Sequence, residues 1–168
     1  MCILIIIGKL ILSRWFRSIL GFFLLIPPSK DFHLSKVGYC EGKITIGKGT
    51  YINSGYRLVS GDNSFVCIGR HCAIGRNFSA ASRTHSLTRP TSDEMYDSHL
   101  KKEASINIGN YVWIGDNVFI KEGVTIDDYA IIGANSVVVK NVKRFEIVGG
   151  NPAKHIRYNT EHYKYDKY

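Results

Sequence analysis

The chain has 168 residues, of which 45% are hydrophobic and 21% are charged, and its formal net charge is +8. These values fit one globular domain and exclude a chain that is disordered by composition, while the positive charge favours anionic partners. The four cysteines form no CxxC pair and no His/Cys cluster with zinc-finger spacing. We therefore expect reduced thiols, a cytoplasmic protein and no metal site.

Residues 1–28 are strongly apolar but include three cations, Lys9, Arg14 and Arg17. Cations near the middle of a bilayer oppose a membrane-spanning helix, and no small-residue cleavage site of a secretory signal follows. Lys9, Ser13 and Arg17 are four residues apart and would share one helical face. We expect a helix over this segment, which either lies on the inner face of a membrane or packs against the end of the domain or another subunit.

A six-residue period begins at Lys43 and becomes strict from Ile108 to Lys143. Cut every six residues, the second stretch reads IGNYVW, IGDNVF, IKEGVT, IDDYAI, IGANSV and VVKNVK. A period of six is not helical, but it is a multiple of the two-residue alternation of extended chain, so each opening aliphatic residue points to the same side. Three short strands and three bends would close a triangular coil of about eighteen residues. The sequence therefore predicts an all-β solenoid of stacked coils.

Two departures from this period predict loops. The segment LVSGDNSFVC has four residues too many, so it should bulge out of its coil. Residues 82–105 have no hydrophobic period, and a long irregular segment in a compact domain is usually functional. We expect the second segment to be the active-site loop of a domain over residues 29–157, followed by a C-terminal tail over residues 158–168.

The segment VWIGDNVFIKEGVTIDDYAIIGANSVVVKNV, followed by GGNPAKHIR, resembles the C-terminal half of the hexapeptide-repeat acyltransferases. That family includes galactoside and maltose acetyltransferases and O-acetyltransferases of capsule and lipopolysaccharide sugars. The resemblance is close from Ile106 to Arg157 and looser from Lys43 to Ser82. It implies a left-handed parallel β-helix and a homotrimer with active sites between subunits. It also implies acetyl-CoA as cosubstrate and a sugar or glycan of a surface polysaccharide as acceptor.

Acetyl transfer to a sugar hydroxyl needs a base that removes the hydroxyl proton, and an imidazole that is neutral near pH 7 is well suited to this role. The resemblance places the catalytic histidine at His85, just before the long loop, and His99 in that loop is the competing candidate. Glu94 lies in an EMY stretch like that of galactoside acetyltransferases. We expect Glu94 to orient the base, with Asp93 and Asp97 as alternatives.

The resemblance also assigns residues to the two substrates. Asn53 matches a region that contacts the acceptor. Trp113 matches the tryptophan of the VWIG repeat, which either lies near the acetyl group or packs on the next coil. The remaining coenzyme A contacts that it implies are Asp116, Ala134, Val139, Lys140, Lys154 and Arg157. The basic side chains among them can pair with the pyrophosphate or the 3′-phosphate.

Other functions stay open at this point. N-acetylation of an aminosugar or of a small-molecule drug would use the same machinery. A metal-dependent hydratase would need three clustered histidines, whereas His71, His85 and His99 are dispersed. A solenoid that serves only as a structural module would not bind acetyl-CoA. No aromatic–basic motif indicates nucleic-acid binding.

Overall fold

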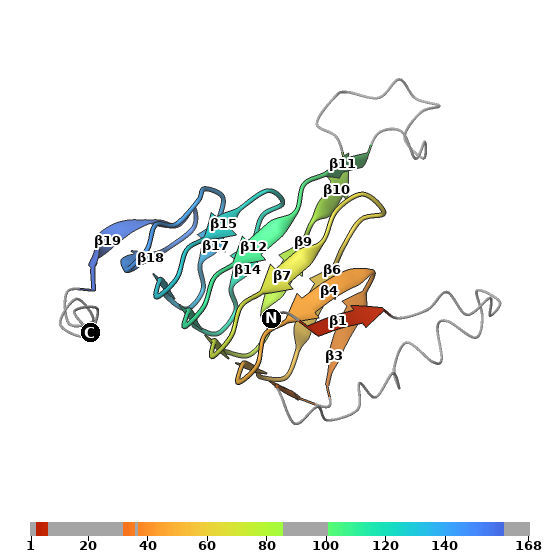
Figure 1. The fold of residues 1–168 in the computed structure, drawn as a ribbon. Coiled ribbons are helices and arrows are strands. Elements are labelled where there is room, and N and C mark those ends of the chain that lie inside the picture. The colour runs from red at the N-terminus through yellow and green to blue at the C-terminus, as the bar shows by residue number, and fades with distance from the viewer. Residues whose placement is uncertain (1–2, 7–31, 36, 86–100, 160–168) are drawn as a thin grey trace, which may run out of the picture.

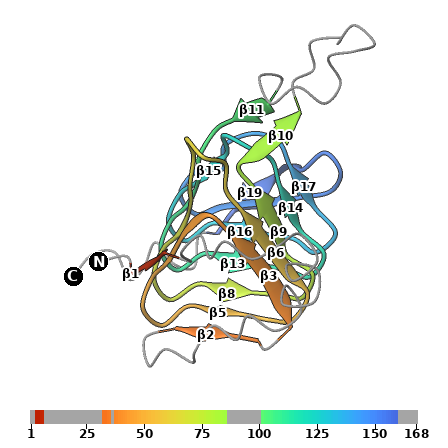
Figure 2. The ribbon, with the colours of Figure 1, turned by 90° about the vertical axis from the view of Figure 1, so that its right-hand side faces the viewer.

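The computed structural model describes residues 3–6, 32–35, 37–85 and 101–159 (Figure 1). All secondary-structure elements within these residues are β-strands. They stack into a solenoid with three sides, each formed by one sheet, and a two-stranded hairpin projects from it (Figures 1 and 2). In Figure 2 successive strands of one side, β2, β5, β8 and β13, lie one above the other.

Each side of the solenoid is a sheet that takes one strand from each coil. Sheet A contains β1 (Ile3–Ile6), β4 (Lys43–Ile46), β7 (Val66–Ile68), β12 (Ile106–Ile108) and β15 (Thr125–Ile126). Sheet B contains β2 (His33–Leu34), β5 (Tyr51–Ile52), β8 (Ala73–Ile74), β13 (Trp113–Ile114), β16 (Ile131–Ile132), β18 (Glu146–Gly149) and β19 (Lys154–Tyr158). Sheet C contains β3 (Gly38–Glu41), β6 (Tyr56–Val59), β9 (Ser79–Ala81), β14 (Phe119–Ile120) and β17 (Val137–Val138). The hairpin consists of β10 (Arg83–His85) and β11 (Lys101–Glu103).

The pairing register confirms the coil length and both departures from it. Trp113 pairs with Ile131, which is 18 residues further along the chain. Tyr51 pairs with Ala73, 22 residues on, and Ala73 pairs with Trp113, 40 residues on. The first long step contains the four extra residues of LVSGDNSFVC, and the second contains the excursion that includes the hairpin. The coils continue in register on both sides of each insertion because parallel pairing holds the sheets together.

The aliphatic residues that open the repeats line the interior, as predicted. All are at most 3% exposed: Ile108, Ile114, Ile120, Ile126, Ile132 and Val138. Burial of each such side chain contributes roughly 1.5 to 3 kcal/mol, so this row is a major source of stability in the described solenoid.

Two of the glycines that follow an aliphatic residue, Gly109 and Gly115, are required by the close approach of the next coil. A Cβ atom at Gly115 would lie 2.6 Å from the backbone nitrogen of Ala134, and one at Gly109 would lie 2.7 Å from that of Asp128. Real Cβ atoms do not approach backbone so closely, so these positions accept only glycine without movement of the neighbouring coil.

Side-chain ladders at the corners reinforce the stacking. His71, Tyr111, Tyr129 and Phe145 occupy equivalent turns with positive φ, and their rings stack with centroids 5.0 to 5.2 Å apart. At another corner the amide of Asn117 accepts a hydrogen bond from Asn77 at 2.9 Å and donates one to Asn135 at 3.0 Å.

The helix expected over residues 1–28 is wrong for residues 3–6, which form β1 and pair antiparallel with β4. The sequence ILII is rich in β-branched residues, and β4 would otherwise present an unpaired edge, so strand addition satisfies its backbone groups. Residues 7–31 lie outside the described residues, and so do the three cations of this segment. Among the described residues, no helix is long and apolar enough to cross a membrane.

The other end of the solenoid is covered by the segment that follows β18. The backbone of β17 bonds to this segment, because Val137 N–H donates to Gly150 C=O at 3.0 Å and Ala153 N–H donates to Val137 C=O at 2.8 Å. The peptide bond between Asn151 and Pro152 is cis. β19 then turns back and pairs antiparallel with β18. The segment GGNPAK therefore covers the last edge of sheet C.

Candidate active site

Both insertions leave the solenoid at one corner, where each strand of sheet C leads towards sheet A. We call it the insertion corner; its turns contain, in successive coils, Ser60, Ser82, Glu122 and Lys140. Backbone hydrogen bonds connect neighbouring turns, with Ser82 N–H donating to Val59 C=O at 2.9 Å and Gly123 N–H donating to Ala104 C=O at 3.1 Å. The turns of the two interrupted coils therefore lie next to each other.

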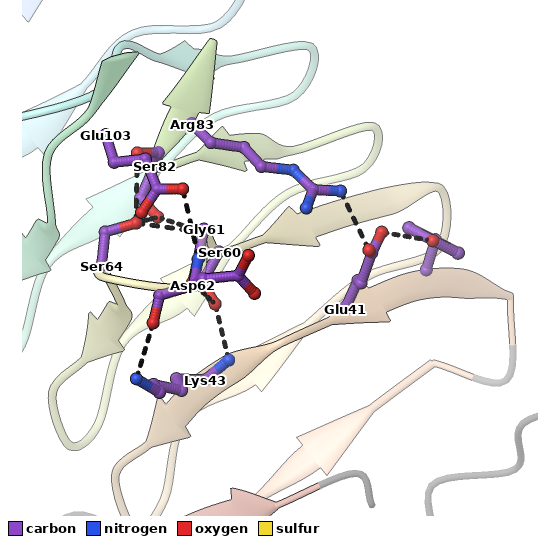
Figure 3. A network of polar contacts seen from close by, with 10 residues as sticks. Glu41, Lys43, Ser60, Gly61, Asp62, Ser64, Ser82, Arg83 and Glu103 are labelled. Carbon is purple, nitrogen blue, oxygen red and sulfur yellow. Dashed lines mark hydrogen bonds and ion pairs between the residues drawn. The ribbon is translucent and has the colours of Figure 1, made fainter. Parts of the chain in front are cut away.

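A polar network joins these two insertions (Figure 3). The carboxylate of Glu103 accepts hydrogen bonds from the N–H groups of Asp62 at 3.2 Å and Asn63 at 2.7 Å. Below it, the buried hydroxyls of Ser64 and Ser82 lie 2.7 Å apart, and both accept from Gly61 N–H. The extra residues of the second coil thus hold both ends of the excursion, at Ser82 and Glu103, and they set the direction in which β10 leaves the solenoid.

Arg83 anchors β10 to a strand two coils away. Its Nη2 lies 2.9 Å from Oε1 of Glu41, and the Tyr39 hydroxyl donates to Oε2 at 2.6 Å. Burial alone would raise the pKa of Glu41, but the hydrogen bonds from Tyr39 and Arg83 outweigh it and the net pKa is lowered. The carboxylate therefore stays ionised and keeps Arg83 in place at neutral pH.

His85 is the last residue of β10 and lines a cavity of about 340 Å³ on the outer face of sheet C. The cavity is lined by Arg57, Ala81, Arg83, Thr84, His85, Phe119 and Glu122. The outward residue between Arg57 and Phe119 in the pairing register is the small Ser79, which leaves space between these two larger side chains. The His85 side chain is exposed, so a solvent-accessible imidazole stands beside a hollow large enough for a small-molecule group.

Glu122 was not predicted from the sequence, yet its carboxylate lies in this cavity and is buried. It is neutralised by Lys121 Nζ at 3.2 Å and Lys102 Nζ at 3.6 Å. Nothing in the repeat IKEGVT distinguishes Glu122 from a solvated corner residue, because its burial depends on the hairpin of another coil. Arg57 and Arg83 were also missed, because their places beside the cavity depend on the stacking of coils that are far apart in the sequence.

Three predicted site residues lie at a different corner, between sheets B and C. Asn53, Asp116 and Ala134 are all exposed there. Asp116 Oδ1 accepts a hydrogen bond from Arg76 N–H at 2.7 Å, so this carboxylate caps the turn of the preceding coil. Ala134 is the residue whose backbone packs against Gly115.

The other residues implied as coenzyme A contacts lie on further parts of the surface. Trp113 is 52% exposed on the outer face of sheet B. Val139 and Lys140 are exposed at the insertion corner, one coil beyond Glu122. Lys154 and Arg157 are exposed on β19.

One chain alone does not bring the predicted base and the B–C corner together. Four residues of extended chain separate Asn117 at that corner from Lys121 at the insertion corner, a span of roughly 13 Å. His85 therefore shares a corner with Lys140 but lies across the width of sheet C from Asp116 and Ala134.

The remaining candidates are not placed by the structure. Glu94, its alternatives Asp93 and Asp97, and His99 lie outside the described residues, so their roles stay predictions. In the described part of the chain, no group of three His, Cys, Asp or Glu side chains is arranged to hold a metal ion. Another hollow of about 360 Å³ lies outside sheet A at Asn107, Thr125 and Asp128, and none of its lining residues is a histidine.

Comparison with known proteins agrees with this architecture. Residues 105–140 match the family model of the bacterial transferase hexapeptide, with six repeats. Galactoside O-acetyltransferase of Escherichia coli K12 is 34% identical over 128 residues, which are 74% of this chain and 60% of that protein. A Saccharomyces cerevisiae protein named as an acetyltransferase is 32% identical over 151 residues, which are 89% of this chain and 71% of that protein.

Among solved structures, a galactoside acetyltransferase in complex with coenzyme A superimposes with a TM-score of 0.57 and 27% identity. The match covers 79% of this chain and 66% of that one. The chain therefore belongs to the hexapeptide-repeat acyltransferase family, and its solenoid has the family's fold, the left-handed parallel β-helix. It spans 60% of the length of the Escherichia coli relative.

Proposed function

We propose that this protein is an acetyl-CoA-dependent O-acetyltransferase that acetylates a hydroxyl of a sugar in a surface polysaccharide or its precursor. The observation that carries the proposal is the exposed His85 beside a cavity, on a hairpin whose base is fixed by Glu103, Ser82 and Arg83. Family membership supports the choice of acetyl-CoA, since the galactoside acetyltransferase with a similar fold was solved with coenzyme A.

In the proposed reaction His85 acts as a general base. The acceptor hydroxyl approaches the thioester carbonyl while the imidazole removes its proton, and a new C–O bond forms. The tetrahedral intermediate then expels coenzyme A as its thiolate, which takes the proton from the imidazolium. The products are an acetyl ester and free coenzyme A, so no covalent enzyme intermediate is needed. Holding the acceptor hydroxyl and the thioester beside the same imidazole provides the proximity on which such a direct transfer depends.

The carboxylate that supports the base is either Glu94, as the resemblance implies, or Glu122, which lines the same cavity as His85. In either case it would hold the imidazole in one orientation and stabilise its protonated form. Lys140, Lys154 and Arg157 are the cations proposed to bind the phosphates of coenzyme A, with Trp113, Asp116, Ala134 and Val139 along its path.

We further propose a homotrimer with active sites between subunits. The B–C corner of one chain is roughly 13 Å from its own insertion corner, four residues of extended chain. Coenzyme A bound at Asp116 and Ala134 would then meet His85 of a neighbouring chain. Association of residues 1–28, of which residues 3–6 form β1, with the inner face of a membrane also stays a proposal, as does the assignment to a cytoplasmic enzyme that modifies lipid-linked glycans.

Replacement of His85 by alanine tests the proposed function. Because general-base catalysis contributes about 10²- to 10⁴-fold, we expect kcat for acetyl-CoA turnover with a glycan acceptor to fall roughly 10³-fold. His33→Ala, at an exposed histidine on β2 far from the cavity, is the matched control and should retain full activity. Turnover of the His85 variant close to that of the parent protein would remove His85 from the mechanism.

The chemical nature of the product separates the proposed ester from the alternative amide. Mild alkali releases acetate from an O-acetyl sugar and leaves an N-acetyl group on an aminosugar or a drug. Mass spectrometry of the product before and after this treatment should show the loss of one acetyl group. A product that keeps its acetyl group would reassign the protein to N-acetylation.

A further inference from the structure

Most charged side chains around the His85 cavity have an ion-pair partner. Arg83 is paired with Glu41 at 2.9 Å, and Glu122 is paired with Lys121 and Lys102. Arg57 lines the same cavity, and no carboxylate among the described residues lies within ion-pair distance of its guanidinium. Arg57 is therefore a cation of this cavity without an ion-pair partner among the described residues, although its charge helps to lower the pKa of Glu41.

Arg57 is positioned so that its side chain can contact a molecule bound in the cavity. It stands on the outer face of β6, in register with Tyr39 on β3 and with Ser79 on β9. Ser79 is small, so the space beside Arg57 is open as far as Phe119 on β14. The guanidinium, an apolar ring and the imidazole of His85 thus border one hollow from different sides.

This combination fits a sugar that carries a negative charge. A guanidinium presents a planar fork of N–H groups that matches a carboxylate or a phosphate, and such charge-assisted pairs are stronger than neutral hydrogen bonds. An aromatic side chain offers apolar surface for the carbon face of a sugar ring. A ring placed between them would present a hydroxyl to His85 while its acidic group is held at Arg57.

We propose that the acceptor is an acidic sugar, whose carboxylate or phosphate is bound by Arg57. The inference rests on the proposed acetyltransferase function and narrows its substrate class. Arg83 does not compete for this role, because Glu41 already occupies its guanidinium. Glu122 does not repel the anion strongly, because two lysines neutralise it. The net charge of +8 would additionally attract an anionic glycan towards the protein.

Acetylation kinetics with three matched acceptors test the proposal: methyl β-galactoside, methyl β-galacturonide and galactose 1-phosphate. The second differs from the first by a carboxylate and the third supplies a phosphate, so the preferred acceptor identifies the source of the charge. The parent protein should have a lower KM for at least one acidic acceptor than for the neutral one. Arg57→Gln should raise that KM roughly 10- to 100-fold, as expected for loss of a hydrogen bond to a charged group.

Controls separate recognition of the acceptor from general effects. Arg57→Gln should leave the KM for acetyl-CoA unchanged and should raise the KM for the acidic acceptor more than the KM for the neutral galactoside. Arg57→Lys should recover part of the affinity for the acidic acceptor. Lys48→Gln removes one positive charge at an exposed turn outside the cavity, so it reports any effect of net charge alone. We expect Lys48→Gln to behave like the parent protein.

Three results would overturn the inference while leaving the acetyltransferase function intact. One is equal KM values for neutral and acidic acceptors in the parent protein; another is an unchanged acidic KM in Arg57→Gln. The third is a selective rise in the KM for acetyl-CoA, which would assign Arg57 to the cosubstrate.

If none of the three acceptors is acetylated, the proposal is tested by calorimetry, which measures binding of the acidic sugars to the coenzyme A-loaded protein. Binding of an acidic sugar that is lost in Arg57→Gln supports the proposal, and absence of such binding refutes it. Failure of the protein to bind coenzyme A at all would instead refute the acetyltransferase function.

Discussion

The coils before residue 105 and the coils after it are built from the same repeat but behave differently. From Ile106 to Val138 every coil has 18 residues, and its inward positions hold aliphatic side chains. Between Lys43 and Ala104 the coils carry two insertions at one corner, a network of buried serines and the hairpin with His85. The interior of the two regions is continuous, so the difference arises at the turns.

This difference shows where a solenoid can change without loss of its fold. The strands of a coil are fixed by the coils above and below, whereas a turn can be lengthened because its extra residues project into solvent. Two insertions in neighbouring coils at the same corner can also support one another, as Glu103 supports the turn at Asp62. The regular coils thus provide the scaffold, and the interrupted coils provide the candidate base.

The largest expected effect tests the claim that regular coils tolerate no change in their close contacts. Gly115→Ala places a Cβ atom 2.6 Å from the backbone of Ala134, whereas at Gly133 the nearest atom would be 3.5 Å away. We expect Gly115→Ala to lower the free energy of unfolding by about 3 kcal/mol, as overpacking typically does. Gly133→Ala should change it by less than about 0.5 kcal/mol. Urea unfolding measures both, and equal effects would show that coil spacing does not select glycine.

The second prediction, of intermediate size, concerns the pH dependence of stability that the interrupted coils cause. Cys40, in the inward row of sheet C, is partly buried, and burial raises its pKa to about 12 from an ordinary value of 9.0. Above about pH 9 the unfolded chain loses this proton while the folded chain retains it, so stability decreases as the pH rises towards 12. Between about pH 9 and pH 10.5 we expect a loss of about 1.5 kcal/mol from this group.

The control is Cys40→Ala, whose urea-unfolding free energy should depend less steeply on pH over the same range. Part of the dependence should remain, because burial also raises the pKa values of Cys72 and Tyr56 in the same interrupted coils. Identical pH dependence in the parent and the variant would mean that the Cys40 thiol titrates as it does in the unfolded chain.

The third prediction is a replacement at Glu103, which should have the smallest effect on the free energy of unfolding but should clearly lower kcat. Glu103→Gln weakens the hydrogen bonds from Asp62 and Asn63, which should lower the free energy of unfolding by about 1 kcal/mol. Because the base of the His85 hairpin would loosen, we expect kcat to fall about tenfold. Hydrogen exchange at the amides of Asp62 and Asn63 should become faster.

A matched change in the regular coils completes this comparison. Asp128 accepts a hydrogen bond from Asn110 N–H at 2.6 Å, so Asp128→Asn removes an equivalent charge from a turn without an insertion. It should lower stability by a similar amount and leave kcat unchanged. An equal loss of activity in both variants would contradict a specific role of the insertion corner.

The sequence by itself determined the repeat, the inward direction of residues such as Ile114 and Ile120, the two places where the coils are interrupted, and the family. Each of these follows from local periodicity or from motifs that are contiguous in the chain. The helix predicted near the N-terminus was wrong for residues 3–6, because the free edge of β4 decides their conformation and no local pattern contains that edge.

Only the tertiary structure decided which side chains surround His85. Glu122, Arg57 and Arg83 come from three coils and meet because stacking places them around one hollow. Likewise Asp116, a candidate cofactor contact in the sequence, bonds to the turn of the preceding coil. The local backbone of a repeat determines the direction in which each side chain points. The residues that this side chain contacts lie 18, 22 or 40 positions away in the sequence, so they also depend on the lengths of the insertions.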